Sequence, residues 1–255
     1  MGNMFFINEA VNHTKEMAET FHDNIEKSIK NTCIYSHNNP SVIINTNKYK
    51  TKIFVTDKDS VQAIVDSEYD VAVLNFASYK FPGGGYLYGS MAQEEALCSE
   101  SFLYNVLSNF NSFYEYNQKN LNNSLYMNRA LFSPDVYFNR NGNEKYCSVL
   151  TCAAPNFGAF KNTDAEENYI NTNNQYALKS RIDFILNIFY TNGCKNLILG
   201  AFGCGVFAQN PKEVATIFSE LLMSKYNGCF ETVNFAIPKS NRNNNYNEFI
   251  NVFGG

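Results

Sequence analysis

Three consecutive glycines, Gly83–Gly85, separate a short apolar segment from a segment with helical periodicity, and they constrain this chain more than any other feature. The apolar segment, Val71–Leu74, has the length and composition of a buried strand. The periodic segment, Ala96–Phe110, predicts a helix. Because glycine lacks a Cβ, its backbone can adopt conformations closed to other residues, and a ligand can lie directly against it. The stretch Asn75–Cys98 is therefore predicted to be a binding loop.

Gln93, Glu94 and Glu95 follow the glycines at the start of the predicted helix. Acidic residues are common in a first helical turn because they favour the helix macrodipole, so the pair also has a purely structural explanation. The nearby glycines favour a site. Successive helical residues point about 100° apart, so we expect that Glu94 and Glu95 cannot both face one atom and have different roles. One glutamate acting first as acid and then as base is the simpler scheme, because a two-carboxylate glycosidase needs its acids on opposite sides of the bond.

The position of this acidic pair creates an electrostatic conflict. A helix N-terminus lowers the pKa of a nearby carboxyl group, whereas a general acid working near neutral pH needs a raised pKa. Burial of the carboxyl group, or a diphosphate bound beside it, would raise the pKa. The sequence alone does not decide which influence is larger.

Further apolar segments recur along the chain, and helical patterns separate them. They are Lys52–Thr56, Cys147–Cys152, Leu197–Ala201 and Thr232–Ile237. Uniformly apolar strands separated by helices indicate an α/β fold with a mostly parallel or mixed sheet covered on both faces. We expect residues 1–50 to form an N-terminal helical extension packed on the body, and residues 51–255 to form a single compact catalytic domain.

Local patterns predict the elements around the sheet. A helix begins after Asn210, where Pro211 and Glu213 complete a capping-box pattern. Other helices are expected at Glu9–Ile29, at Ser60–Val65 with Asp57 as its N-cap, and at Asp164–Tyr190. Short strands are expected at Cys33–Tyr35, Val42–Ile44 and Val136–Phe138.

A second glycine-rich loop, Gly203–Phe207, follows the apolar segment that ends at Ala201. Gly203 and Gly205 fit a dinucleotide-binding pattern loosely, but no acidic residue stands at the distance expected of a ribose partner. Small residues leave backbone N–H groups free to bind a pyrophosphate, with a helix N-terminus behind them. A plain tight turn explains the glycines equally well. In open α/β sheets, such loops gather at the carboxyl ends of the strands, where ligands bind.

Composition excludes several classes of protein. The net charge is −4 and the pI about 5.5, unlike a protein that grips duplex nucleic acid with a basic surface. The seven cysteines are widely spaced, and the three histidines lack metal-binding spacing, so we expect reduced thiols and no metal site. No apolar run reaches the roughly 18 residues of a membrane span, and no signal peptide is recognisable. We expect a soluble, cytoplasmic monomer.

The glycine triplet, seven intervening residues and Gln-Glu-Glu together resemble the signature of the poly(ADP-ribose) glycohydrolases. The fuller pattern from Val73 through Pro82 to Cys98 is similar to the microbial-type, bacterial-like branch of that family, within the macrodomain superfamily. The late loop Gly200–Phe207 resembles the branch's second phosphate-binding loop. The resemblance covers residues 51–238. It implies a macrodomain-like three-layer α/β/α fold with a mixed, mostly parallel sheet that binds ADP-ribose.

The resemblance also implies roles for the matching residues. Glu95 would be the catalytic carboxylate, which protonates the leaving ribose 2′-oxygen and then activates water. Glu94, which we count with it as catalytic, and Asn75 would hold ribose hydroxyls. The other predicted contacts with ADP-ribose are Phe76, Ala77, Gly83, Gly84, Gly85, Gln93, Gly203, Cys204, Gly205, Val206 and Phe207. The resemblance implies neither a metal nor a redox cofactor.

The expected activity is hydrolysis of ribose–ribose O-glycosidic bonds in poly(ADP-ribose) carried by modified proteins, with release of ADP-ribose. Two alternatives stay open. One is a reader module that binds ADP-ribose without turnover, although a reader has no need of two acids beside an anionic ligand. The other is a hydrolase of the same fold that removes single ADP-ribose groups. No counterpart of the tyrosine-rich accessory loop of other branches is identifiable, so the adenine contacts and the choice between endo and exo cleavage stay open.

Overall fold

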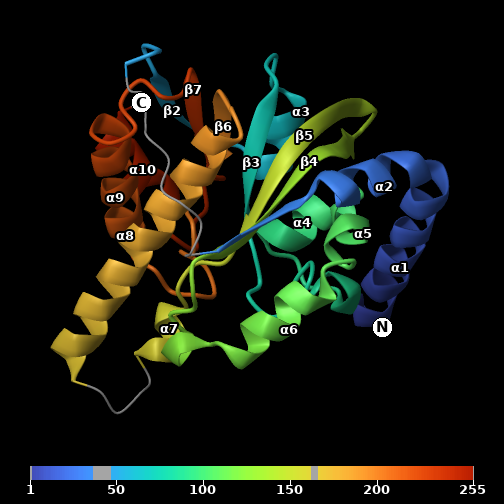
Figure 1. Cartoon of the computed structure of the whole chain (residues 1–255), viewed down its shortest axis with the longest axis horizontal. Helices are drawn as coiled ribbons and strands as arrows, with labels where there is room; N and C mark the ends of the chain where they lie inside the picture. Colours follow the sequence, from blue (N-terminus) through green and yellow to red (C-terminus); the bar gives the residue numbers. More distant parts are fainter. Residues whose placement is uncertain (1, 37–46, 162–165, 255) are drawn as a thin grey trace.

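The computed structural model describes residues 2–36, 47–161 and 166–254. Its centre is a seven-stranded sheet in the order β1-β4-β5-β3-β6-β7-β2 (Figure 1). The strands are β1 (Cys33–Ser36), β2 (Lys52–Thr56), β3 (Val71–Phe76), β4 (Arg129–Arg140), β5 (Asn143–Cys152), β6 (Asn196–Leu199) and β7 (Thr232–Ala236). The strands from β5 to β2 in the sheet order are parallel, whereas β4 is antiparallel to both of its neighbours. The sheet is thus mixed and mostly parallel, as predicted.

Helices cover both faces of this sheet (Figure 1). The α-helices are α1 (Gly2–Thr20), α2 (His22–Asn31), α3 (Ser60–Val65), α4 (Gln93–Ser99), α5 (Leu103–Leu107), α6 (Asn111–Lys119), α7 (Phe157–Phe160), α8 (Glu167–Thr191), α9 (Pro211–Met223) and α10 (Asn245–Phe253). Two 3-10 helices are η1 (Tyr86–Tyr88) and η2 (Asn122–Ser124). No helix in the described residues is long and apolar enough to cross a membrane.

Two hydrophobic cores lie on opposite faces of the sheet. Ala72 and Leu74 of β3 pack into the core under α8, α9 and α10, whereas Val71 and Val73 pack into the core under α3, α4 and α5. Because alternate residues of a strand point to opposite faces, β3 must be apolar throughout. Burying each of the valine and leucine side chains contributes about 1.5–3 kcal/mol. The predicted three-layer α/β/α architecture is confirmed.

The N-terminal segment departs from the prediction in one respect. The helix expected over Glu9–Ile29 is two helices, α1 and α2, which meet at Phe21 with non-helical dihedrals. The break lets the Phe21 ring pack against Tyr137 of β4 at 4.3 Å and Phe102 at 6.0 Å between ring centroids. After α2 the chain enters the sheet as its edge strand β1, paired with β4. The proposed division of the chain at residue 51 stays a prediction.

The prediction of one continuous helix over Ala96–Phe110 was also wrong. This segment divides into α4 and α5, because the backbone at Glu100 and Ser101 pairs with the C-terminal part of β4. The Ser101 hydroxyl donates to Leu97 O at 2.6 Å and accepts from Leu103 N at 2.9 Å. One side chain therefore satisfies backbone groups at the end of one helix and the start of the next.

Smaller predictions had mixed outcomes. The N-cap of α3 is Asp59, which accepts from Gln62 N, and the predicted cap Asp57 instead accepts from Lys239 N. Asn210 caps α9 as predicted. The strand predicted at Val136–Phe138 is confirmed as part of the longer β4, and the predicted strand Cys33–Tyr35 as β1. The strand predicted at Val42–Ile44 lies outside the described residues.

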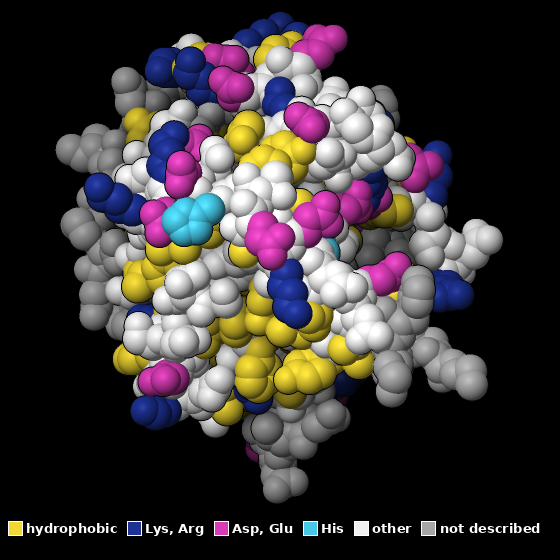
Figure 2. Space-filling view, turned by 90° about the vertical axis from the view of Figure 1, so that its right-hand side faces the viewer, with side chains coloured by type: hydrophobic (Ala, Val, Ile, Leu, Met, Phe, Trp, Pro, Cys, Tyr) yellow, Lys and Arg dark blue, Asp and Glu magenta, His cyan; other side chains and the backbone are white. Residues whose placement is uncertain are grey.

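Charged side chains of both signs are interspersed on the face that carries α1 and α2, and hydrophobic side chains gather on its lower part (Figure 2). This face therefore offers no continuous basic surface to a nucleic-acid backbone.

Arg140, at the end of β4, joins two elements that flank the glycine loop. Its Nη1 donates to both carboxylate oxygens of Asp59 at 2.8 and 2.7 Å, and its Nε donates to Glu100 Oε2 at 2.6 Å. Asp59 caps α3, and Glu100 ends α4. The Arg140 side chain is only 18% exposed, so water competes poorly with these charge-assisted hydrogen bonds.

We expect Arg140→Met to lower the free energy of unfolding by about 2 kcal/mol, because two partly shielded carboxylates lose their cation. Urea denaturation measures this loss. The control is Lys27→Met, since Lys27 forms an exposed pair with Asp135 at 2.9 Å and should cost less than about 1 kcal/mol. Equal losses in the two variants would contradict the special role of Arg140.

Candidate active site

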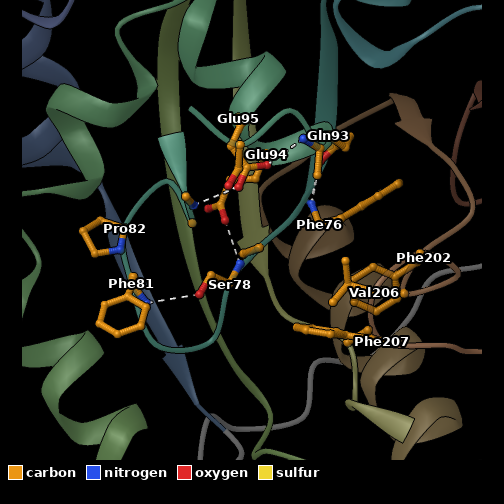
Figure 3. A pocket seen from close by; sticks show the side chains of 18 of the residues that line it. Phe76, Ser78, Phe81, Pro82, Gln93, Glu94, Glu95, Phe202, Val206 and Phe207 are labelled. Atoms are coloured by element: carbon orange, nitrogen blue, oxygen red, sulfur yellow. Dashed lines mark hydrogen bonds between the residues drawn. The ribbon is translucent and has the colours of Figure 1, made fainter. Parts of the chain in front are cut away.

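A cleft of about 730 Å³ opens at the carboxyl end of β3, between the loop after β3 and the loop after β6 (Figure 3). This volume suits a nucleotide-sized ligand. The predicted site residues that line the cleft are Phe76, Ala77, Gly84, Gly85, Gln93, Glu94, Glu95, Gly203, Gly205, Val206 and Phe207. Three other predicted residues, Asn75, Gly83 and Cys204, are absent from this lining. The two glycine-rich loops thus contribute to one cavity.

Asn75 is the second-to-last residue of β3 and is completely buried. Its Nδ2 donates to Glu94 Oε1 at 3.1 Å and to Thr151 Oγ1 at 3.2 Å. Its Oδ1 is buried without a hydrogen-bond partner in the described part of the chain. Asn75 therefore supports the Glu94 carboxylate from behind.

The Gln93 side chain connects α4 to β3 by hydrogen bonds. Its Oε1 accepts from Phe76 N at 2.8 Å, and its Nε2 donates to Leu74 O and to Ser60 Oγ, both at 2.9 Å. Because the amide satisfies backbone groups just where β3 ends, it fixes the start of α4 against the sheet. The two glutamates that follow are consequently held at a defined place above the strand (Figure 3).

The two carboxylates accept hydrogen bonds from the loop that surrounds them. Glu94 Oε2 accepts from Ser78 N at 2.7 Å, and Glu95 Oε1 accepts from Gly85 N at 2.8 Å. Glu95 Oε2 accepts from Ala92 N at 3.1 Å, the backbone donor at the N-cap of α4. Both side chains are buried, at 3% exposure for Glu94 and 8% for Glu95.

The expectation that Glu94 and Glu95 cannot face one atom was wrong. A Cβ placed on Gly84 would lie 2.6 Å from Glu95 Oε1 and 2.9 Å from Glu94 Oε2, so both carboxylates converge on this glycine. The Cα–Cβ directions diverge along the helix, but a glutamate side chain is long enough to bend toward a common point. The loop, which wraps around the start of α4, supplies a donor to each carboxylate there.

Burial dominates the electrostatics of Glu94. Loss of hydration raises the pKa of Glu94 from its ordinary value of 4.5 to about 8, and the charge of Glu95 adds to this rise. The hydrogen bonds from Ser78 and Asn75 act in the opposite direction. Near neutral pH, Glu94 is thus mostly protonated. At this residue, burial therefore has a larger effect on the pKa than the helix N-terminus has.

The second loop presents unpaired backbone donors to the cleft. Cys204 N donates to Ala201 O at 3.1 Å, so this amide is already engaged. In the described part of the chain, the N–H groups of Gly205, Val206 and Phe207 have no hydrogen-bond acceptor. Three successive N–H groups without an acceptor among the described residues are available to bind an anion.

An aromatic support for this loop was missed by the sequence analysis. The Phe207 ring packs against Tyr126 at 5.9 Å, and Tyr126 stacks on Tyr79 at 4.2 Å between centroids. Beneath them, the buried Arg181 of α8 donates to Ala153 O and, at 2.7 Å, to Asn128 Oδ1. Tyr126 and Arg181 lie outside both motifs, and no local pattern in the sequence marks them.

The protein combines a macrodomain-like α/β/α fold with a cleft that holds a loop of free backbone donors and a buried pair of glutamates. Together these features define a class of hydrolases that process ADP-ribose. A family model for the microbial-type PARG catalytic domain matches residues 6–141, and the chain belongs to this family of poly(ADP-ribose) glycohydrolases. The predicted family, fold and enzyme class are confirmed.

Solved structures agree with this assignment. The poly(ADP-ribose) glycohydrolase of Thermomonospora curvata is 27% identical with a TM-score of 0.85, over 98% of this chain and 100% of that chain. A structure of the same enzyme bound to the inhibitor ADP-HPD is 28% identical with a TM-score of 0.84, over 97% and 99%. The Deinococcus radiodurans enzyme in complex with ADP-ribose is 28% identical with a TM-score of 0.80, over 89% and 96%. Comparison with curated proteins gave no match.

We expect Gly84→Ala to abolish activity, because the new Cβ would displace both carboxylates and because Gly84 has a φ of +58°. Gly142→Ala is the matched control, since Gly142 has a φ of +82° with no atom within 4 Å of the added Cβ. Both variants should lose about 1 kcal/mol or more of stability from backbone strain. Turnover assays should show a loss in the Gly84 variant alone; an active Gly84→Ala protein would refute this account.

The raised pKa of Glu94 predicts a pH-dependent stability. The unfolded chain loses the Glu94 proton above about pH 4.5, while the folded protein keeps it up to about pH 8. The contribution of Glu94 to the free energy of unfolding is thus fully present below about pH 4.5, and it is lost as the pH rises to about 8. Over this window, the unfolding free energy of the wild type should fall more steeply than that of Glu94→Gln, by at most about 1.4 kcal/mol per pH unit. Parallel profiles in urea denaturation would contradict the shift.

Proposed function

We propose that the chain hydrolyses the ribose–ribose O-glycosidic bond of poly(ADP-ribose) and releases ADP-ribose, with Glu95 as acid and then base. The observation that carries this proposal is the convergence of Glu94 and Glu95 on Gly84, in a cleft whose other wall is a loop with free N–H groups. Such a cleft can hold the diphosphate on backbone donors and bring the terminal ribose to the carboxylates.

The proposed reaction uses one proton carrier in two steps. Glu95 gives its proton to the 2′-oxygen of the leaving ribose while the bond from that oxygen to C1 of the terminal ribose breaks. Water then attacks the oxocarbenium-like C1, and its proton returns to Glu95. One proton carrier is the simpler scheme, because both carboxylates converge on Gly84, whereas a two-carboxylate mechanism places its acids on opposite sides of the glycosidic bond.

The backbone donors around Glu95 fix its orientation for this task. Gly85 N and Ala92 N each hold one of its carboxylate oxygens, so little reorganisation is needed on reaction. A protonated Glu94 lies beside it and can bond a ribose hydroxyl without placing a negative charge of its own near the diphosphate. We assign Asn75 as a positioning residue, since it is buried and acts through Glu94.

Turnover is favoured over a reader function by the two buried acids themselves. Burying a carboxyl group costs free energy, and an anionic ligand gains nothing from negative charge nearby. A site evolved only to recognise ADP-ribose would be more stable and more attractive to the ligand without them. Polymer on modified proteins is the substrate that we propose.

The location and assembly of the protein belong to this proposal as well. None of the seven cysteines, all of which lie in the described residues, forms a disulfide, which favours a reducing compartment and hence the cytoplasm. The monomeric state and the lack of duplex nucleic-acid binding stay predictions.

We expect Glu95→Gln to slow release of ADP-ribose from poly(ADP-ribose) by about a hundred- to ten-thousandfold, because the amide cannot transfer the proton. Chromatography of the products measures this rate, and calorimetry should show that the variant still binds ADP-ribose. Glu213→Gln is the matched control, because Glu213 has the equivalent third position in helix α9 and lies outside the cleft. No release by the wild type, or undiminished release by Glu95→Gln, would overturn the proposal.

A further inference from the structure

The cleft has a second apolar wall on the far side of the carboxylates from the Gly205–Phe207 donors. We call it the leaving-side wall and define it by four cleft-lining residues: Phe81, Leu87, Tyr88 and Tyr104. They belong to the loop after β3, to η1 and to α5. Figure 3 shows Phe81 across the carboxylates from Val206 and Phe207. The glutamates therefore lie between two apolar walls.

Two rings of the leaving-side wall are open to solvent on a fixed backbone. Phe81 is 56% exposed and Tyr88 is 74% exposed. The backbone below them is held, since Tyr88 N donates to Gly85 O at 2.9 Å and Gly84 N to Phe81 O at 3.2 Å. In addition, the Tyr86 hydroxyl anchors η1 to Ala10 O of α1 at 3.1 Å. Exposed aromatic rings on rigid backbone are a preorganised surface for a flat apolar group.

The reaction determines what must lie against this wall. The bond that breaks joins C1 of the terminal ribose to the 2′-oxygen of the adenosine in the preceding unit. With the terminal diphosphate on the donors of Gly205–Phe207, that adenosine extends past Glu95 in the opposite direction. We propose that the leaving-side wall binds the adenine of the adenosine left behind, an inference that rests on the proposed function.

The charges in the cleft select the base over the other groups of the preceding unit. The described residues that line the cleft include Glu94 and Glu95 and no Lys or Arg side chain. A second diphosphate would find no cation there, whereas a neutral purine can stack on Phe81 or Tyr88. Base–aromatic stacking corresponds to roughly a five- to hundredfold change in affinity. A protein side chain that carries a single ADP-ribose would lack this flat partner.

Two small substrates test this assignment. The first is ADP-ribose joined through C1 of its terminal ribose to the 2′-oxygen of adenosine, and the second has the same linkage to a ribose without a base. Wild-type kcat/KM should be roughly five- to hundredfold higher for the first substrate. In Tyr88→Ala and Phe81→Ala this ratio should fall toward one. Calorimetry with free ADP-ribose checks that each variant is folded, since that ligand does not reach the wall.

Tyr176→Ala is the matched control, because Tyr176 is 73% exposed on α8 and lies outside the cleft, and it should keep the wild-type ratio. A wild-type ratio of one, or variants of Phe81 and Tyr88 that keep a high ratio, would overturn the role of the wall while leaving the proposed function intact. Cleavage of neither substrate by the wild type would overturn the proposed function, and the wall's role with it.

Discussion

The backbone of the glycine loop donates hydrogen bonds to the same two carboxylates that the cleft presents to its ligand. Ser78 N holds Glu94 and Gly85 N holds Glu95, and Gly84 passes between these contacts with no space for a Cβ. Hydrogen bonds from backbone N–H groups to carboxylates are among the stronger ones in proteins. The conformation of the loop and the positions of the two carboxylates therefore depend on each other, and neither can change without the other.

This arrangement also explains why Glu94, which lies at a helix N-terminus, keeps a proton. The N-terminus of α4 and the loop amides favour the charged form, but complete burial of Glu94 outweighs them and raises its pKa to about 8. Glu94 therefore retains a proton near neutral pH. A neutral Glu94 lets an anionic substrate approach without meeting a negative charge on that side chain.

The sequence predicted those parts of the site whose chemistry is local. The glycine triplet, the acidic pair and the capped start of α9 are each visible within a few residues, and the buried strands are recognisable from uniform apolarity. The breaks at Phe21 and Ser101 were not predictable, because contacts with β4 cause them. The convergence of the two glutamates was missed for a related reason, since helical periodicity gives the direction of Cβ and not the end of a long side chain. Tyr126 reaches Phe207 only through the tertiary fold.

The two halves of the cleft are built differently, and the difference follows from their tasks. The glycine loop is held by β3 through Gln93, by α4 through its carboxylates and by α1 through Tyr86. In the second loop, the N–H groups of Gly205, Val206 and Phe207 have no acceptor among the described residues, and Val206 is 87% exposed. A reaction is slower when its catalytic groups must first reorganise, so it is an advantage if the protein already holds these groups in place. Binding groups must instead keep hydrogen-bonding capacity for the ligand, because a donor already satisfied within the protein adds nothing to affinity. The chain thus places its internal hydrogen bonds around the proton carrier and leaves its free donors where the diphosphate is proposed to bind.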